Sequence, residues 1–148
     1  MSIKVQNRQR KLPLDSKRWN AWASRLHRAA GWTEEEVTIR IVSAQALRSM
    51  NRRFRGEDNF TDVLAFSAEV PAGFDSPRFL GDIAVSIEAV REQAKVYGHS
   101  EEEELKLLMA HGVAHLMGYG DSTARERRRI RHVERKLIQA ADMAEEED

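Results

Sequence analysis

The sequence contains no cysteine, and this absence excludes two structural devices. The chain can form no disulfide and can bind no metal through a thiolate, so His, Asp and Glu remain as the usual zinc ligands. A chain without disulfides also fits a reducing compartment. Any metal centre in this protein therefore has to be built from imidazole and carboxylate groups.

The sequence also lacks a long apolar run and an excess of charge of one sign. No segment approaches the roughly 20 apolar residues of a membrane span, and residues 1–14 are polar and basic. We therefore expect a soluble, cytoplasmic protein with no membrane partner. The 24 Lys and Arg residues balance 24 Asp and Glu residues, so the whole chain is not a nonspecific polycation. This balance leaves the oligomeric state open.

The 148 residues, 41% of them hydrophobic, suit one compact domain with a real core, which we expect to span residues 1–148. Val37, Ile39 and Ile41 alternate with polar residues, which predicts a half-buried strand. Residues 61–66 and 80–86 predict two more strands, separated by a loop that contains Pro71, Gly73 and Pro77. We expect the strand at 61–66 to follow the first strand through a right-handed parallel crossover.

Helical spacing and capping residues predict five helices. The predicted N-cap of the first helix is Asp15 or Ser16, and the second helix is expected to begin at about Ala44. The predicted N-caps of the last three helices are Ser86, Ser100 and Thr123. We expect Trp19 and Trp22 in the core, and we expect Phe54 to face inward from the second helix. The last helix should pack through Ile130, Val133, Leu137 and Ala141. The pattern predicts an α/β (α+β) fold, with a small mixed central sheet packed with several helices.

The most informative motif is the pair His111 and His115. Histidines four residues apart on a helix point the same way, so both imidazoles can bind one metal ion. Gly118 and Gly120 can end the helix through backbone angles that other residues resist, and so present Asp121 to the same point. A site of two histidines and one carboxylate keeps an open coordination position, as a catalytic metal requires.

The simplest alternative is that two histidines share a partly buried helix face by chance. Leu108, Met109 and Leu116 surround them, so unpaired imidazoles would be costly there. Gly112 stands where metalloprotease helices carry a glutamate after the first histidine, which disfavours a zinc peptidase.

Two runs of arginine are candidates for binding phosphate, although a solvated helix face is the commoner explanation of such runs. They comprise Arg48, Arg52, Arg53 and Arg55, and then Arg125, Arg127, Arg128, Arg129 and Arg131.

Three segments, taken in order, resemble the YbeY family of rRNA-maturation endoribonucleases. They are residues 51–66, which include the sequences NRRFRG and TDVLAF, then Leu80 to Ile83, and then His111 to Asp121. Their order and spacing match over roughly residues 48–125. The resemblance implies an α/β fold with a central sheet and one bound zinc ion, and a metal-dependent endoribonuclease specific for single-stranded RNA. It also implies a role in 16S rRNA 3′-end maturation and ribosome quality control, with ribosomal subunits or assembly factors as partners.

The third metal ligand departs from the family's usual motif. The family has a histidine ten residues after the first, preceded by Asp, and here Gly120 and Asp121 occupy those places. Asp121 remains our predicted ligand, because carboxylate oxygens bind zinc at about 2.0–2.2 Å. Its charge would leave a zinc ion a poorer Lewis acid than three neutral imidazoles would. His132 and His99 are alternatives, each with an ordinary surface explanation.

Arg55 falls on the family's arginine in the cleft near the metal, and we predict that it grips the scissile phosphate. The structural alternative is an ion pair with Glu57 or Asp58. Asp82 is expected to turn or tether its strand, with a hydrogen bond to a ligand imidazole as an additional role.

Two other functions stay open. A ribosome-assembly factor, binding RNA or ribosomal proteins, would use its metal only as a structural staple. A metal-dependent hydrolase of another substrate is the third interpretation, because one fold hosts many chemistries.

Overall fold

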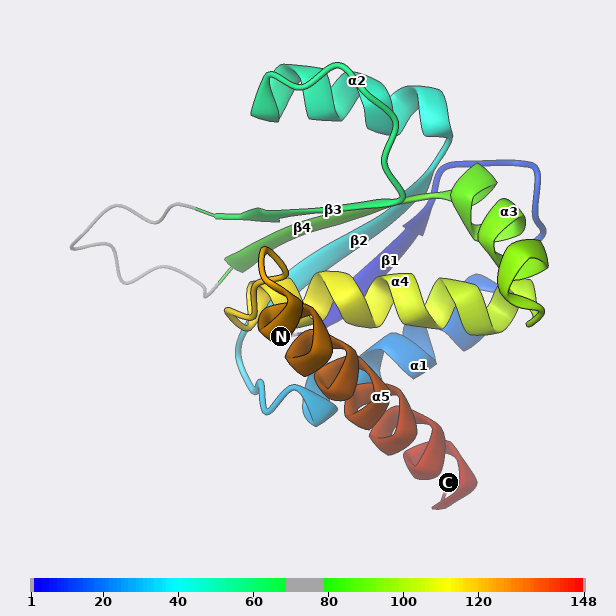
Figure 1. Ribbon diagram of the computed structural model, residues 1–148. Helices are drawn as coiled ribbons and strands as arrows, with labels where there is room; N and C mark the ends of the chain where they lie inside the picture. Colours follow the sequence, from blue (N-terminus) through cyan, green and yellow to red (C-terminus); the bar gives the residue numbers. More distant parts are fainter. Residues whose placement is uncertain (1, 69–78, 148) are drawn as a thin grey trace.

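A computed structural model describes residues 2–68 and 79–147, so the predicted loop with Pro71, Gly73 and Pro77 lies outside the described residues. Its centre is a four-stranded sheet in the order β1-β2-β4-β3 (Figure 1). The strands are β1 (Ile3–Asn7), β2 (Glu36–Val42), β3 (Val63–Ser67) and β4 (Phe79–Ser86). β1, β2 and β4 are mutually parallel, and β3 pairs with β4 in the antiparallel direction. The predicted mixed sheet is confirmed.

The predicted parallel crossover into residues 61–66 is wrong. β3 lies at the edge of the sheet and runs antiparallel to its one neighbour, β4. The parallel connection from β2 is completed by β4 instead, with Ile39 of β2 opposite Ile83 of β4. Apolar alternation shows that a segment is a strand, but it does not show its direction or its neighbour. β1 was not predicted for a different reason: only Ile3 and Val5 mark this segment as a strand.

The described residues contain five helices, all beginning close to the predicted caps. They are α1 (Ser16–Ala29), α2 (Ala44–Arg55), α3 (Ile87–Tyr97), α4 (Glu101–Leu116) and α5 (Ala124–Glu147). Each helix begins with a side-chain oxygen that accepts a hydrogen bond from a backbone N–H group of the first turn. These capping residues are Asp15, Ser43, Ser86, Ser100 and Thr123. These bonds satisfy donors that a helix start leaves free. None of the described helices is both long and apolar enough to cross a membrane.

The helices cover the sheet unequally. α2 lies on one face, while α1, α4 and α5 lie on the other (Figure 1). The main core fills the second side and includes both predicted tryptophans, Trp19 and Trp22. A small cluster around Leu47 packs under α2. Phe54 does not face inward as predicted: it is 62% exposed and contacts Phe66 edge to face, because one short helix over few strands gives little surface to bury.

α4 approaches the sheet most closely at Gly112. A Cβ atom there would lie 2.6 Å from Cγ2 of Ile83, a fully buried β-branched side chain in β4. Only glycine lets the helix lie at this depth, so the residue that argued against a metalloprotease has a packing function.

α5 packs across α1 and α4 through an apolar stripe and through hydrogen bonds. Ile130, Leu137 and Ala141 are buried in the main core, as predicted. Near the C-terminal end, the Asp142 carboxylate accepts from Trp22 Nε1 at 2.8 Å and from Lys106 Nζ at 2.9 Å. These contacts fix the position of α5 along α4.

Gly112→Ala should lower the free energy of unfolding by about 1–2 kcal/mol. Overpacking a core costs about 1–3 kcal/mol, and the better helix propensity of alanine returns up to about 1 kcal/mol. Urea denaturation of Gly112→Ala, Ile83→Ala and the double variant measures the effect. Because Ile83→Ala removes the obstructing atoms, the double variant should be more stable than the sum of the single losses predicts. Simple additivity would contradict this packing account.

Candidate metal centre and cleft

The structure brings the three predicted ligands together. Nε2 of His111 and Nε2 of His115 lie 3.0 Å apart on one face of α4. Oδ2 of Asp121 lies 3.3 Å from Nε2 of His115 and 3.6 Å from Nε2 of His111. All three donor atoms fall within 4.8 Å of one another, so the group could hold a metal ion. Two imidazole nitrogens and one carboxylate oxygen are donors that transition metals such as zinc accept.

The turn after α4 returns the chain to the histidines. Gly118 has a φ of +107° and follows the helix end, where the Tyr119 N–H donates to the Ala114 carbonyl at 3.1 Å. Side chains rarely adopt such a φ, which explains the glycine. The prediction for Gly120 is wrong, because its φ is not positive. A Cβ there would lie 2.4 Å from Oε2 of Glu126, which is the far end of a flexible side chain and can move aside, so the structure does not require a glycine at this position.

A fourth residue, Glu134 of α5, orients the first histidine. Its buried carboxylate accepts a hydrogen bond from Nδ1 of His111, leaving Nε2 directed toward His115 and Asp121. Carboxylates commonly hold the second nitrogen of a metal-binding imidazole in this way, fixing its tautomer and orientation. Glu134 was not among the residues predicted from the sequence. The signal available was an acidic residue within the apolar stripe of Ile130 and Leu137.

The carboxylates around His111 give the site a preference for positive charge. Burial alone would lower the pKa of His111, but the hydrogen bond and charge of Glu134 outweigh it, with help from Asp121 and Asp62. The net result is a raised pKa, because nearby negative charges favour the protonated ring. The same charges favour a bound cation, which the metal interpretation requires.

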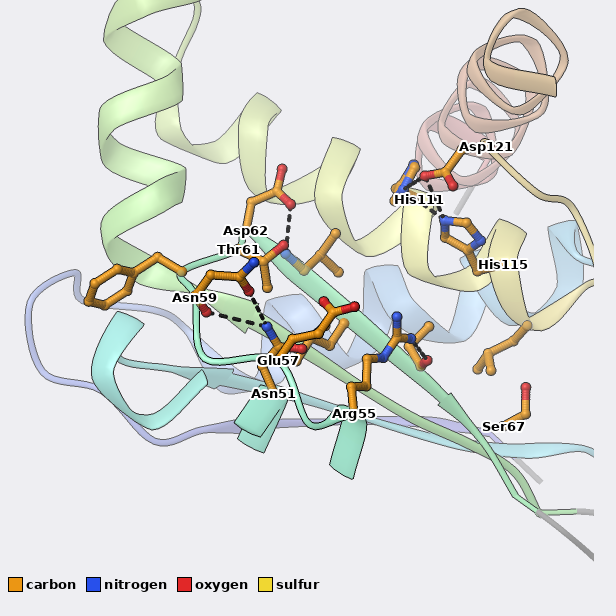
Figure 2. A pocket seen from close by; sticks show the side chains of 15 residues that line it. Asn51, Arg55, Glu57, Asn59, Thr61, Asp62, Ser67, His111, His115 and Asp121 are labelled. Carbon is orange, nitrogen blue, oxygen red and sulfur yellow. Dashed lines mark hydrogen bonds and ion pairs between the residues drawn. The ribbon is translucent and has the colours of Figure 1, made fainter. Parts of the chain in front are cut away.

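The donor group opens onto a cleft of about 460 Å³ between α4, β3 and the end of α2. Figure 2 shows His111, His115 and Asp121 gathered on one side and Arg55 on the α2 side. The segment between α2 and β3 forms another wall, held by a hydrogen bond of 2.6 Å from Asn51 Nδ2 to Oδ1 of Asn59. The cleft is lined mainly by polar groups, as expected for a polar substrate.

Arg55 lies in the cleft without a carboxylate partner among the described residues. Its Nη2 donates to the Ala65 carbonyl at 2.8 Å, and its guanidinium lies 5.6 Å from the ring centre of Phe66. Among the described residues no ion pair joins Arg55 to Glu57 or Asp58, and Asp58 pairs with Arg48 at 2.8 Å instead, so this alternative is wrong. The role of Arg55 in binding phosphate stays a prediction.

The remaining candidates lie elsewhere. Asp82 pairs with Arg40 at 2.6 Å and so ties β4 to β2, as expected of a tether. It shares the α2 face of β4 with Ala84, so its predicted hydrogen bond to a ligand imidazole is wrong. Nε2 of His99 is occupied by the buried Glu104 at 2.5 Å, and His132 is exposed on α5. Neither belongs to the donor group.

Glu134→Gln should weaken zinc binding about 10- to 100-fold at alkaline pH, the usual effect of losing such a carboxylate. Competition with a zinc chelator measures the affinity, and Glu92→Gln, which changes an exposed carboxylate on α3, is the matched control. Equal affinity in Glu134→Gln and the control would show that Glu134 does not orient the ligand.

The pH dependence of the same variant gives a second readout. Metal binding needs neutral imidazoles, and the raised pKa of His111 lets protons compete with the metal above the ordinary value of 6.5. Zinc affinity of the original chain should therefore keep rising with pH beyond that point. In Glu134→Gln the pKa of His111 falls, so the rise should end at lower pH.

Known proteins resemble this chain over most of its length. The model of the family described as "Endoribonuclease YbeY" matches residues 4–142. A protein named endoribonuclease YbeY from Sulfurovum sp. is 42% identical over 115 residues, which are 75% of this chain and 76% of that protein. Another of the same name from Roseiflexus sp. is 41% identical over 118 residues, 76% of this chain and 74% of the other.

Two further comparisons bear on length and fold. A relative of the same name from Myxococcus xanthus is 38% identical over 104 residues, but the match covers 35% of that longer protein. The solution structure of the Thermotoga maritima protein TM1509 has a TM-score of 0.64 at 22% identity, over 94% of this chain and 88% of that one. This likeness supports the fold, and the family match over residues 4–142 confirms the resemblance seen in the sequence: the chain belongs to the YbeY family.

Proposed function

We propose that this protein is a metal-dependent endoribonuclease that cleaves single-stranded RNA. The observation that carries the proposal is the group of His111, His115 and Asp121, which opens onto the cleft that holds Arg55. The relatives described above are named endoribonucleases, which supports RNA as the substrate.

In this proposal His111, His115 and Asp121 hold one zinc ion, which when bound supplies Lewis acidity and an activated water. Glu134 fixes the ring of His111, so that its Nε2 is held ready for the ion. Asp121 adds a negative charge that a third imidazole would not. We therefore expect Asp121 to moderate the acidity of a bound water, compared with a site of three histidines.

Arg55 positions the phosphate. Its contact with the Ala65 carbonyl uses one of its five N–H groups, which leaves others for a phosphate in the cleft. A guanidinium can bind two phosphate oxygens at once and stabilise the charge that develops during cleavage. Its place opposite the donor group suits a phosphodiester held between the two.

We extend the proposal to 16S rRNA 3′-end maturation and ribosome quality control in the cytoplasm, with ribosomal subunits or assembly factors as partners. Membership of the YbeY family supports this extension. The assembly factor with a purely structural metal is less well supported. Structural zinc usually has four protein ligands, whereas the described residues bring together three.

Asp121→Ala should lose both bound zinc and cleavage of single-stranded RNA, because two imidazoles alone hold the metal weakly. Asp121→His, which supplies a neutral third ligand, should keep or raise cleavage. The measurements are metal content by atomic emission and cleavage of a labelled RNA, with His115→Ala as a second ligand variant. If His115→Ala retained both zinc and full activity, the assignment would be wrong.

Arg55→Ala should lower kcat for RNA cleavage about 100-fold while leaving zinc content unchanged, because the charge that stabilises the transition state is removed. Arg52→Ala, an exposed arginine on the same helix that does not line the cleft, is the matched control. Equal activity of the two variants would exclude a role for Arg55 in the chemical step.

A further inference from the structure

A second groove adjoins the metal centre on the side away from α2. It has a volume of about 600 Å³ and lies between α4, α5 and the C-terminal end of α3. Asp62, His111 and Asp121 line both this groove and the cleft of Arg55. The two hollows therefore meet at the donor group, and a chain bound in one can continue into the other.

One wall of the groove is a stripe of arginines on α5. Arg127, Arg131 and Arg135 are spaced four residues apart, so they lie along one side of the helix at intervals of about 6 Å. All three are exposed. Arg127 reaches the turn that carries the third ligand, where its Nη1 donates to the Asp121 and Ser122 carbonyls at 3.3 Å. The stripe thus runs from the metal centre outward.

The arginines outside the stripe provide a contrast. Arg125 and Arg128 belong to the same run in the sequence and are exposed, but they line neither hollow. The run is therefore divided by the helix into residues that face the groove and residues that do not.

The opposite wall offers an aromatic surface. Tyr97 is 67% exposed at the end of α3 and lies 6.0 Å from the His99 ring. Four acidic groups among the described residues line the groove. Glu104 and Glu134 are buried and hydrogen-bonded to histidines. Asp62 accepts a hydrogen bond from Nε2 of Gln93 at 3.3 Å, and Asp121 belongs to the donor group, where a bound metal would offset its charge. A groove with arginines on one wall and an exposed ring on the other combines phosphate contacts with base stacking.

We infer that this groove binds the part of the single-stranded RNA that extends beyond the cleaved phosphate. The inference rests on the proposed function for the identity of the ligand. Arg127, Arg131 and Arg135 contact successive phosphates, and Tyr97 stacks on a base. The continuity of the groove with the metal centre favours RNA over an acidic peptide, since an RNA held at the cleft has to leave it along one of the walls.

The test compares two pairs of variants with the same loss of charge: Arg131→Gln with Arg135→Gln, and Arg125→Gln with Arg128→Gln. Zinc-loaded protein binds a fluorescent single-stranded phosphorothioate RNA, which resists cleavage, at several salt concentrations. The groove pair should weaken binding tenfold or more and reduce the slope of log affinity against log salt by about 1.4, or about 0.7 for each phosphate contact. The control pair should stay within about twofold of the original chain.

Two further variants separate charge from stacking. Arg131→Lys with Arg135→Lys should keep most of the affinity and the salt slope, which also shows that the helix tolerates substitution. Tyr97→Ala should weaken binding about tenfold with the salt slope unchanged, because stacking releases no counterions.

Equal binding by the groove pair and the control pair would overturn the inference, and so would an acidic peptide that displaces the RNA as well as unlabelled RNA does. The outcome is separable from the proposed function. If the original chain cleaves ordinary RNA while all variants bind alike, the inference that the groove binds RNA is wrong and the proposed nuclease activity is supported. If the chain binds RNA through the groove but never cleaves it, the proposed nuclease activity is wrong and the inference that the groove binds RNA is supported.

Discussion

The contact of Gly112 with Ile83 determines the rest of the site. Because a Cβ atom at position 112 would lie 2.6 Å from Cγ2 of Ile83, only a glycine lets α4 lie this deep against β4. His111, next to this glycine, and His115, one helical turn later, are thereby held beside β3 and opposite the end of α2, where the cleft opens. α5 then packs over α4 and brings the Glu134 carboxylate to Nδ1 of His111. One close approach of helix and sheet thus places ligands, cleft and orienting carboxylate together.

The electrostatics of the centre follow from this packing. His111 is partly buried, which by itself would disfavour a charge, yet Glu134, Asp121 and Asp62 surround it and raise its pKa. Grouping carboxylates beside an imidazole at an apolar helix face is costly unless a cation or proton joins them. A bound metal would satisfy this charge, and Arg55 of the cleft, together with the arginines of the groove, would draw a polyanion toward it. The chain has no net charge, so any attraction for a polyanion has to come from the way its charges are distributed.

The features predicted from sequence are those that local chemistry decides. The alternation of Val37, Ile39 and Ile41 predicted β2, and Ser100 predicted the start of α4, because strand period and helix caps act within a few residues. The features that depend on distant residues were missed. Edge strand β1 has too few apolar residues to be recognised, and the antiparallel direction of β3 depends on its partner β4. Glu134 is 23 residues from His111 in the chain, so no local motif joins them.

The central claim is that His111, His115 and Asp121 form an open metal site. X-ray absorption spectroscopy of the zinc-loaded protein, compared with the Asp121 variant, tests it most directly, because multiple scattering from imidazole rings counts the histidine ligands and the first shell gives the distances to the nitrogen and oxygen ligands. The account predicts one zinc ion per chain with two imidazole nitrogens at about 2.0–2.1 Å and one protein carboxylate oxygen, the remaining coordination coming from solvent. Asp121→Ala, loaded in the same way, should retain no stoichiometric zinc at this site, because two imidazoles alone hold the metal weakly. A zinc ion with four protein ligands, or one whose ligands are unchanged in that variant, would contradict it.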